Sequence, residues 1–200
     1  VYSRLLRLSS GKETALPSLA VECDLCTSWE HPDSLTYVFH IRPMVRWHNI
    51  EPLNSQELTA QDVAYSINRL LTPGWPGADL LQAVASVEAK DDLTVILRLN
   101  YPDADFLLAL ANGLSKIVSP KAVAVNGDLR KEPTIGTGPW ILNHMEMGQL
   151  QFEANPHYYE PELPKLQQLK IVPISNATIR LGALIAGRID LTPIDTEGWE

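Results

Sequence analysis

Two cysteines separated by two residues, Cys23 and Cys26, have the spacing that most readily supports chemistry in this sequence. Such a pair can ligate zinc, cycle between dithiol and disulfide in a redox enzyme, or form a local structural disulfide. A zinc site needs two further ligands, and no second CxxC pair occurs. The histidines available nearby are His31, His40 and His48. We expect no metal site, and the sequence leaves open whether the two thiols are joined or reduced.

The loop Gly136-Thr137-Gly138-Pro139 also has chemical potential, because closely spaced glycines can expose backbone N–H groups to an anion. It lacks the Lys-Ser/Thr of a P-loop and the full GxGxxG pattern of a dinucleotide site, and the residues after it have strand character. We therefore expect a structural turn. The alternative is a backbone contact of Gly136, Thr137 or Gly138 to a bound solute.

One aromatic residue, Trp75, lies in a loop between Pro73-Gly74 and Pro76-Gly77. These dipeptides end a helix and open a segment that has little else to bury. An aromatic ring in such a loop can stack on a ligand, so Trp75 is the aromatic candidate for ligand contact. The other large aromatics are expected mostly in the core, and they are Trp29, Trp47, Trp140, Tyr158 and Tyr159.

The sequence contains no arrangement that favours an enzyme. Its five histidines are scattered, without neighbouring Ser and Asp residues in an order that predicts a triad. The acid pairs Asp91-Asp92 and Asp103/Asp105 occur where turns and helix caps are expected, which explains them without acid–base catalysis. We expect neither a catalytic residue nor a cofactor.

Charge and hydropathy restrict the partners. The formal net charge is -8 and no basic stripe is present, so nucleic acid is not an expected partner. The longest apolar stretches, such as 106–111, are far shorter than the roughly 18 to 20 residues of a membrane span. The chain opens on Val1 without a basic n-region or a cleavage site, so we expect any targeting peptide to lie outside it and interpret both ends as cuts.

Period-2 alternation of apolar and polar residues predicts two half-buried strands, at 35–42 and 93–99. Between them, Thr59 and Asp62 form a capping pair, and apolar residues at helical spacing follow. These residues predict a helix that ends near Thr72.

The next segment predicts short helices. A helix is expected over 104–111 with Asp103 as its cap. The run 116–118 is expected to be a strand or a buried link, and Pro120 is well placed in the first turn of a further helix.

The last third predicts a hairpin around Met147-Gly148, a strand over 169–174, a helix stopped by Gly187, and a strand over 189–194. The order strand, helix, strand is typical of a βαβ crossover that joins two parallel strands. We therefore expect this part of the chain to be α/β.

Taken in order, several segments resemble the signature elements of the family 5 extracellular solute-binding proteins, which serve bacterial ABC importers of peptides, nickel and opines. These segments are 24–30 (DLCTSWE), 35–42 (LTYVFHIR), 45–49 (VRWHN), 58–63 (LTAQDV), 136–140 (GTGPW), 155–159 (NPHYY), 178–181 (TIRL) and 187–190 (GRID). Short motifs in a family's own order and spacing are specific in combination. The cysteines depart from the family pattern, which more often has Pro or Gly and Ala at those positions.

The resemblance implies an α/β fold similar to the type 2 periplasmic binding proteins, with one incomplete lobe in this chain. It implies a smaller mixed α+β subdomain over 1–134, part of a larger α/β subdomain over 135–200, and a second lobe outside the chain. The implied function is capture of an oligopeptide, dipeptide or similar small solute between two lobes, followed by delivery to the transmembrane subunits of an ABC permease. No cofactor and no reaction are implied.

The same resemblance places the Trp75 loop and the link 112–115 near the mouth of the cleft. Trp75, Asn112 and Ser115 are then candidate solute contacts. It also implies a periplasmic or extracellular location, where an oxidising environment would permit a Cys23–Cys26 disulfide. Association with the membrane would occur only through the permease or a lipid anchor outside this chain.

Two other functions stay open on the sequence. The first is a metal- or redox-dependent protein that uses the Cys23/Cys26 pair. The second is a binding protein recruited as a sensor or peptide chaperone, with the same cleft but another partner. The sequence does not name the solute, because family specificity is set largely by the second lobe.

Overall fold

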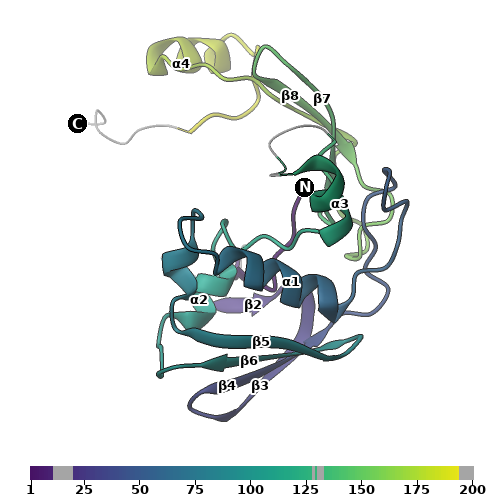
Figure 1. Ribbon diagram of the computed structural model, residues 1–200. Helices are drawn as coiled ribbons and strands as arrows, with labels where there is room; N and C mark the ends of the chain where they lie inside the picture. Colours follow the sequence, from purple (N-terminus) through teal and green to yellow (C-terminus); the bar gives the residue numbers. More distant parts are fainter. Residues whose placement is uncertain (11–19, 128, 130–132, 194–200) are drawn as a thin grey trace, which may run out of the picture.

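An antiparallel sheet of four strands forms the base of the computed structural model, which describes residues 1–10, 20–127, 129 and 133–193 (Figure 1). Its strand order is β3-β4-β6-β5. The strands are β3 (Cys26–Asp33), β4 (Thr36–Ile41), β5 (Val84–Asp91) and β6 (Thr94–Leu99). The predicted strands at 35–42 and 93–99 are confirmed as β4 and β6, which pair with each other. In β4 the alternate residues Tyr37, Phe39 and Ile41 are buried, as the period-2 pattern requires.

Helix α1 (Ala60–Leu70) covers one face of this sheet and packs against β5 and β6 (Figure 1). The predicted cap is confirmed, because the Asp62 carboxylate accepts the Thr59 backbone N–H at 2.9 Å and the Thr59 hydroxyl at 3.2 Å. The helix buries Val63, Ile67 and other residues of one stripe. It ends at Leu70, just before the predicted end, and a short 3₁₀ helix, η1 (Ala78–Leu81), follows the loop.

The predicted cap of the next helix is wrong by two residues. Helix α2 (Phe106–Ala111) begins after Asp105, while the Asp103 carboxylate accepts the Asp105 backbone N–H at 2.9 Å. Asp103 therefore closes a turn with its side chain before the helix begins, an alternative that aspartate offers the backbone.

The segment 116–118 forms a link in which Ile117 and Val118 are buried and Lys116 is exposed, with one isolated bridge, Arg4–Lys116, and it leads into α3 (Pro120–Asn126). Pro120 lies in the first turn as predicted, and the Ser119 hydroxyl accepts the Lys121 N–H at 3.2 Å. Near this link the N-terminal segment forms a two-stranded sheet, β1 (Leu6–Leu8) with β2 (Val21–Cys23).

The C-terminal part forms a three-stranded antiparallel sheet that extends away from the four-stranded sheet (Figure 1). The predicted hairpin is confirmed as β7 (Trp140–Glu146) and β8 (Gln149–Ala154), with Met147 and Gly148 both at positive φ in the turn. Strand β9 (Gln168–Ile171) is shorter than predicted. Helix α4 (Ala177–Ile185) has Asn176 as its N-cap and Gly187 at a φ of 64° after its end.

The predicted strand over 189–194 is wrong for residues 189–193, and Ile194 lies outside the described residues. No parallel pair occurs among the described strands either, since every ladder there is antiparallel. The physical reason is the lack of a partner: a strand needs a neighbour for its backbone groups, and Leu191 is 88% exposed. Helix α4 likewise has no buried residue, whereas the core lies around the four-stranded sheet.

None of the helices in the described part of the chain has the length and apolar character that a membrane span requires. The division at 134/135 stays a prediction. Ile135, immediately after it, is 1% exposed and belongs to the same core cluster as the four-stranded sheet.

Candidate functional site

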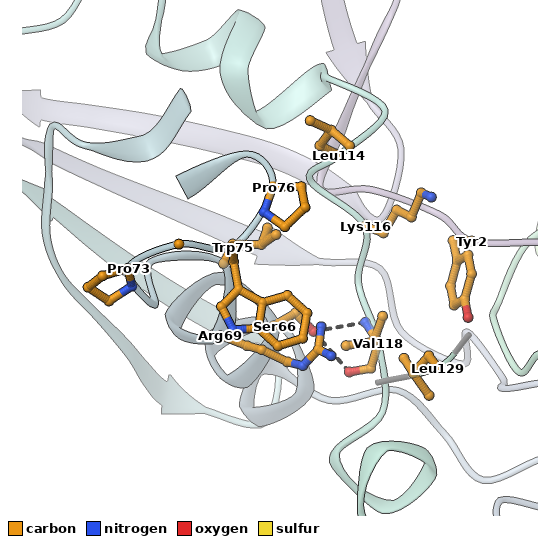
Figure 2. Close-up of a pocket in the computed structure, with 12 residues that line it drawn as sticks. Tyr2, Ser66, Arg69, Pro73, Trp75, Pro76, Leu114, Lys116, Val118 and Leu129 are labelled. Atoms are coloured by element: carbon orange, nitrogen blue, oxygen red, sulfur yellow. Dashed lines mark hydrogen bonds between the residues drawn. The ribbon is translucent and has the colours of Figure 1, made fainter. Parts of the chain in front are cut away.

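A pocket of about 410 Å³ opens where the end of α1, the loop after it and the buried link to α3 meet (Figure 2). The residues that line it come from α1, the loop after it, the link, and two further positions, one near the N-terminus and one after α3. They are Ser66, Arg69 and Leu70 of α1, Pro73, Gly74, Trp75 and Pro76 of the loop, Leu114, Lys116 and Val118 of the link, and Tyr2 and Leu129. Segments far apart in the sequence thus form one concave surface, which is the usual setting of a small-molecule site.

The half-buried Trp75 forms one wall together with Arg69. The Arg69 guanidinium carbon lies 4.0 Å from the centroid of the Trp75 ring, within the range of a cation–π contact. Backbone bonds hold the loop, since Trp75 N–H donates to Thr72 O at 3.2 Å and Ala78 N–H donates to Trp75 O at 3.1 Å. Trp75 therefore lines a pocket, and its contact with a ligand stays a prediction.

Gly77 lets the loop approach the link closely. Its φ is 90°, and a Cβ atom built there would lie 3.1 Å from Leu114 Cβ. Only glycine adopts such a backbone without strain and leaves room for the neighbour. The loop that carries Trp75 is therefore packed against the opposite side of the pocket.

The floor of the pocket is fixed by a buried hydroxyl. Ser66 Oγ accepts the Val118 backbone N–H at 2.8 Å and lies 2.7 Å from Asp62 O and 2.9 Å from Val118 O, to one of which it donates. Since a serine carries one hydroxyl proton, these bonds use its full capacity as a donor. They connect α1 to the link and thereby fix the distance between the two walls of the pocket that these segments form.

Positive charge dominates the lining. Lys116 Nζ lies 5.6 Å from the centroid of the Tyr2 ring, on the other side of the pocket from Trp75 and Arg69 (Figure 2). Burial raises the pKa of Tyr2, and the charge of Arg69 partly opposes the increase. Of the described residues that line the pocket, none is an aspartate or glutamate.

Two other predicted contacts, Asn112 and Ser115, do not line this pocket. Ser115 is buried and donates to Ala109 O at 2.6 Å, which closes the turn after α2. Asn112 Oδ1 accepts the Leu114 N–H at 2.9 Å, and the residue borders a different cavity of about 350 Å³. Both residues shape the link that carries Leu114 and Lys116.

The loop Gly136-Thr137-Gly138 also lies away from the pocket, in a packed crossing of chain segments. Gly138 N–H donates to Val1 O at 2.7 Å, and His48 N–H donates to Gly136 O at 2.8 Å. A Cβ atom would lie 2.2 Å from Val1 O at Gly136 and 2.5 Å from it at Gly138. The glycines are thus explained by close backbone approach.

His48 joins this crossing to the core. Its ring is 1% exposed, with Nε2 3.1 Å from Gly138 O and Nδ1 3.4 Å from the Gly136 nitrogen, whose N–H it accepts. Burial lowers the pKa of His48 to about 4, although the bond to the Gly138 carbonyl opposes this effect. The ring is therefore neutral near pH 7, with its proton on Nε2.

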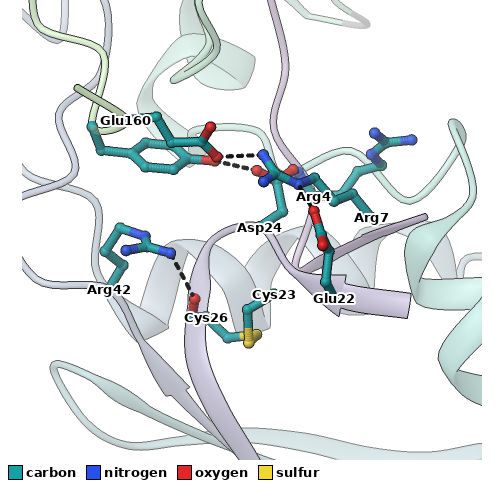
Figure 3. Close-up of polar contacts among 9 residues, drawn as sticks. Arg4, Arg7, Glu22, Cys23, Asp24, Cys26, Arg42 and Glu160 are labelled. Carbon is teal, nitrogen blue, oxygen red and sulfur yellow. Dashed lines mark hydrogen bonds and ion pairs between the residues drawn. A yellow bond between two sulfur atoms is a disulfide. The ribbon is translucent and has the colours of Figure 1, made fainter. Parts of the chain in front are cut away.

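Cys23 and Cys26 are joined by a disulfide, which spans the corner between β2 and β3 (Figure 3). Both sulfurs are used in this bond. The nearby His40 pairs instead with Glu30 at 3.0 Å. Within the described residues no group of three His, Cys, Asp or Glu side chains could hold a metal ion.

A polar network lies on one side of the disulfide (Figure 3). The Asp24 carboxylate, 5% exposed, accepts the Arg4 backbone N–H at 2.8 Å and the hydroxyl of Tyr159. Arg7 pairs with Glu22 at 2.7 Å and also with Glu160. These bonds attach the segment after β8 to the β1–β2 sheet.

Of the residues that line the pocket, the sequence analysis singled out Trp75 and did not consider Arg69, Lys116 and Tyr2. An arginine in the last turn of a helix is ordinarily explained by the helix dipole, so Arg69 carried no separate signal. Lys116 and Tyr2 reach the pocket only through the tertiary fold. The position of Arg69 six residues before Trp75 was the single local sign, because a loop that returns on its helix brings such residues together.

The pocket has aromatic and basic walls on a scaffold of sheet and helix, a common setting for a small-molecule site. The chain belongs to the bacterial extracellular solute-binding proteins, family 5, whose model matches residues 20–200. The resemblance noted in the sequence is therefore confirmed.

Individual relatives agree with this assignment. The chain is 29% identical over 213 residues to di/tripeptide-binding protein 4 of Pseudomonas aeruginosa, which covers 96% of this chain and 39% of that protein. The structure of the periplasmic binding protein DppA from Helicobacter pylori, in complex with the peptide STSA, matches with a TM-score of 0.80 and 29% identity, over 94% of this chain and 40% of that one. The binding protein MoaA from A. tumefaciens R10, in complex with mannopinic acid, matches with a TM-score of 0.81 and 29% identity, over 95% and 38%.

These matches confirm the predicted fold class, an α/β periplasmic binding protein. The chain spans about two fifths of the length of the relatives it matches.

Proposed function

We propose that this chain is part of the solute-binding component of an ABC-type importer, which captures a short peptide or similar small solute and delivers it to a membrane permease. The observation that carries the proposal is the family match over 20–200, combined with the open pocket beside Trp75. Binding and lobe closure are the whole activity, and no reaction is catalysed. The location that fits this role is the periplasm or the outer cell surface.

The pocket supplies this lobe's share of the solute contacts. Trp75 lines the pocket with one ring face covered by Arg69, and the Ser66 bonds to Val118 keep the opposite wall in place. Asn112 and Ser115 act indirectly, by shaping the link that carries Lys116. Gly136, Thr137 and Gly138 connect the proposed subdomains, 1–134 and 135–200, and contribute packing rather than solute contact. A second lobe outside this chain would close over the pocket.

Isothermal titration of the full natural chain against pools of di- to tetrapeptides, an opine and a nickel–histidine complex tests the proposal. Trp75→Ala should weaken binding of the preferred solute by about tenfold or more, because truncating an aromatic anchor removes stacking area. Trp140→Ala is the matched control, since Trp140 lies on β7 outside the pocket. Absence of heat with every candidate solute would overturn the proposal.

A further inference from the structure

The disulfide-closed corner between β2 and β3 is hydrogen-bonded to the N-terminal segment that leads into β1. Leu25 N–H donates to Arg4 O at 3.0 Å. Asp24 N–H donates to Leu5 O at 3.2 Å, and the Asp24 carboxylate accepts the Arg4 backbone N–H at 2.8 Å. Residues 24 and 25 stand between the two cysteines, so the disulfide restrains the backbone that makes all three bonds.

The same N-terminal segment is also bonded to the link that forms one wall of the pocket. Arg4 forms a bridge with Lys116, which lines the pocket. Ile117 N–H donates to Ser3 O at 3.0 Å, and the Arg4 guanidinium donates to Ala111 O at 3.0 Å. A continuous series of hydrogen bonds therefore runs from the disulfide corner through the N-terminal segment to the pocket wall.

Asp24 holds this junction with a buried charge. The residue is 5% exposed, and its carboxylate also accepts the hydroxyl of Tyr159. The Arg42 backbone N–H donates to Leu25 O at 2.8 Å, and its guanidinium carbon lies 5.1 Å from the centroid of the Tyr159 ring. A buried carboxylate that loses its donors is costly, because its desolvation is then no longer offset. Asp24 therefore constrains where Arg4 can lie.

The disulfide acts on the native structure more than on the unfolded chain. Its cysteines are three positions apart, so the closed loop is very short and removes little entropy from the unfolded chain. In the folded protein the bond restrains the corner from which Asp24 projects (Figure 3). Loss of the bond should therefore loosen this junction without unfolding the four-stranded sheet.

A dithiol reductant can cleave the bond. Cys23 is partly exposed whereas Cys26 is 0% exposed, so the reductant meets the Cys23 sulfur first. A thiolate of the reductant attacks that sulfur, the S–S bond breaks, and the electron pair leaves on the Cys26 sulfur. The second thiolate then displaces Cys23 from the mixed disulfide. The reductant ends as a disulfide, and its two protons end on the cysteine thiols.

We propose that Asp24 and the Cys23–Cys26 disulfide are positioning residues for the pocket, and that reduction of the disulfide loosens the pocket wall over 116–118 and weakens solute binding. The inference rests on the proposed solute-binding function and adds a dependence on redox state to it. The disulfide is a structural constraint here, and no solute is oxidised or reduced.

Hydrogen–deuterium exchange of the full natural chain, before and after treatment with dithiothreitol, tests the coupling. Peptides that cover the link over 112–118 should exchange at least about tenfold faster after reduction, because local opening of the link becomes easier. Peptides that cover β6 should keep their exchange rate, since this strand lies inside the four-stranded sheet. The comparison separates local loosening from a general loss of stability.

Variants assign the effect to the named residues. The double variant Cys23→Ser with Cys26→Ser should exchange rapidly at the link with or without dithiothreitol. Asp24→Ala should do so with the disulfide intact, and dithiothreitol should add little, because both changes remove one contact. Asp33→Ala is the matched control: its carboxylate also accepts a backbone N–H, that of Leu35 at 2.8 Å, but at the turn between β3 and β4. Should Asp24→Ala not fold, the double variant still decides.

Three exchange results would overturn the inference: an unchanged rate at the link after reduction, an increase that β6 shares, or a response to dithiothreitol that persists in the double variant. Isothermal titration with the pools of di- to tetrapeptides separates the two proposals. The reduced protein should bind at least about fivefold more weakly, as in the weaker couplings between sites. Equal binding by both forms would remove the inference and keep the proposed function. No heat in either form would remove the proposed function, while faster exchange at the link would still support the coupling.

Discussion

The buried His48 should contribute to the loss of stability of this protein on acidification. Its ring accepts the Gly136 N–H on Nδ1 and contacts the Gly138 carbonyl through Nε2, an arrangement that only the neutral imidazole satisfies. Burial lowers the pKa of His48 from 6.5 to about 4. Between these two values the unfolded chain holds a proton that the folded chain does not, so the free energy of unfolding falls as the pH falls through this window.

The magnitude follows from the pKa difference. One unit corresponds to about 1.4 kcal/mol, so this shift lowers the free energy of unfolding by roughly 2 to 3 kcal/mol between pH 7.5 and pH 4.5. Above pH 7 the effect is absent, and below about pH 4 it no longer grows, because both states of His48 are then protonated. Such a loss is a large part of the stability of an ordinary domain.

Urea unfolding followed by tryptophan fluorescence, at several pH values from 4.5 to 7.5, measures this effect in the unaltered protein and in His48→Gln. The variant loses the titrating group, so the stability difference between the two proteins should be largest at pH 7.5 and shrink by roughly 2 to 3 kcal/mol toward pH 4.5. Carboxylates titrate in both proteins and cancel in the comparison. His157→Gln, at an exposed position, is the control. A stability difference that stays constant across this range would refute the reasoning.

Two further predictions concern packing and hydrogen bonding outside the pocket. Gly136→Ala should lower the melting temperature strongly, because the new Cβ would lie 2.2 Å from the Val1 carbonyl oxygen. Gly113→Ala is the control and should change the melting temperature little, because no atom lies within 4 Å of its Cβ position. Equal melting temperatures of the two variants would contradict this prediction. Tyr159→Phe should reduce the free energy of unfolding, measured by urea titration, by about 1.5 to 3 kcal/mol, because it removes a hydrogen bond to the buried Asp24 carboxylate. Tyr101→Phe is the control and should leave the free energy of unfolding nearly unchanged, because Tyr101 is 46% exposed.

The elements that sequence reasoning predicted well are those whose signals are local. Each of these signals lies within a few neighbouring residues. Examples are the alternation around Phe39, the capping pair Thr59 and Asp62, and the turn at Met147-Gly148. The fold class followed from several such segments in a family's order. The strand expected over 189–194 failed over 189–193 because strand formation depends on a neighbouring strand, which local alternation cannot supply.

The sequence by itself determined that a Pro- and Gly-rich loop would follow α1 and carry Trp75, because proline cannot continue a helix and glycine favours turns wherever they occur. The spacing of Cys23 and Cys26 allowed a disulfide between them but did not decide between a disulfide and two reduced thiols. Only the tertiary structure decided that Arg69 stacks on Trp75 and that Lys116 and Tyr2 face them across one cavity. The physical reason is that a binding pocket is a meeting of distant segments, whose separation is set by core packing and by bonds such as Ser66 to Val118.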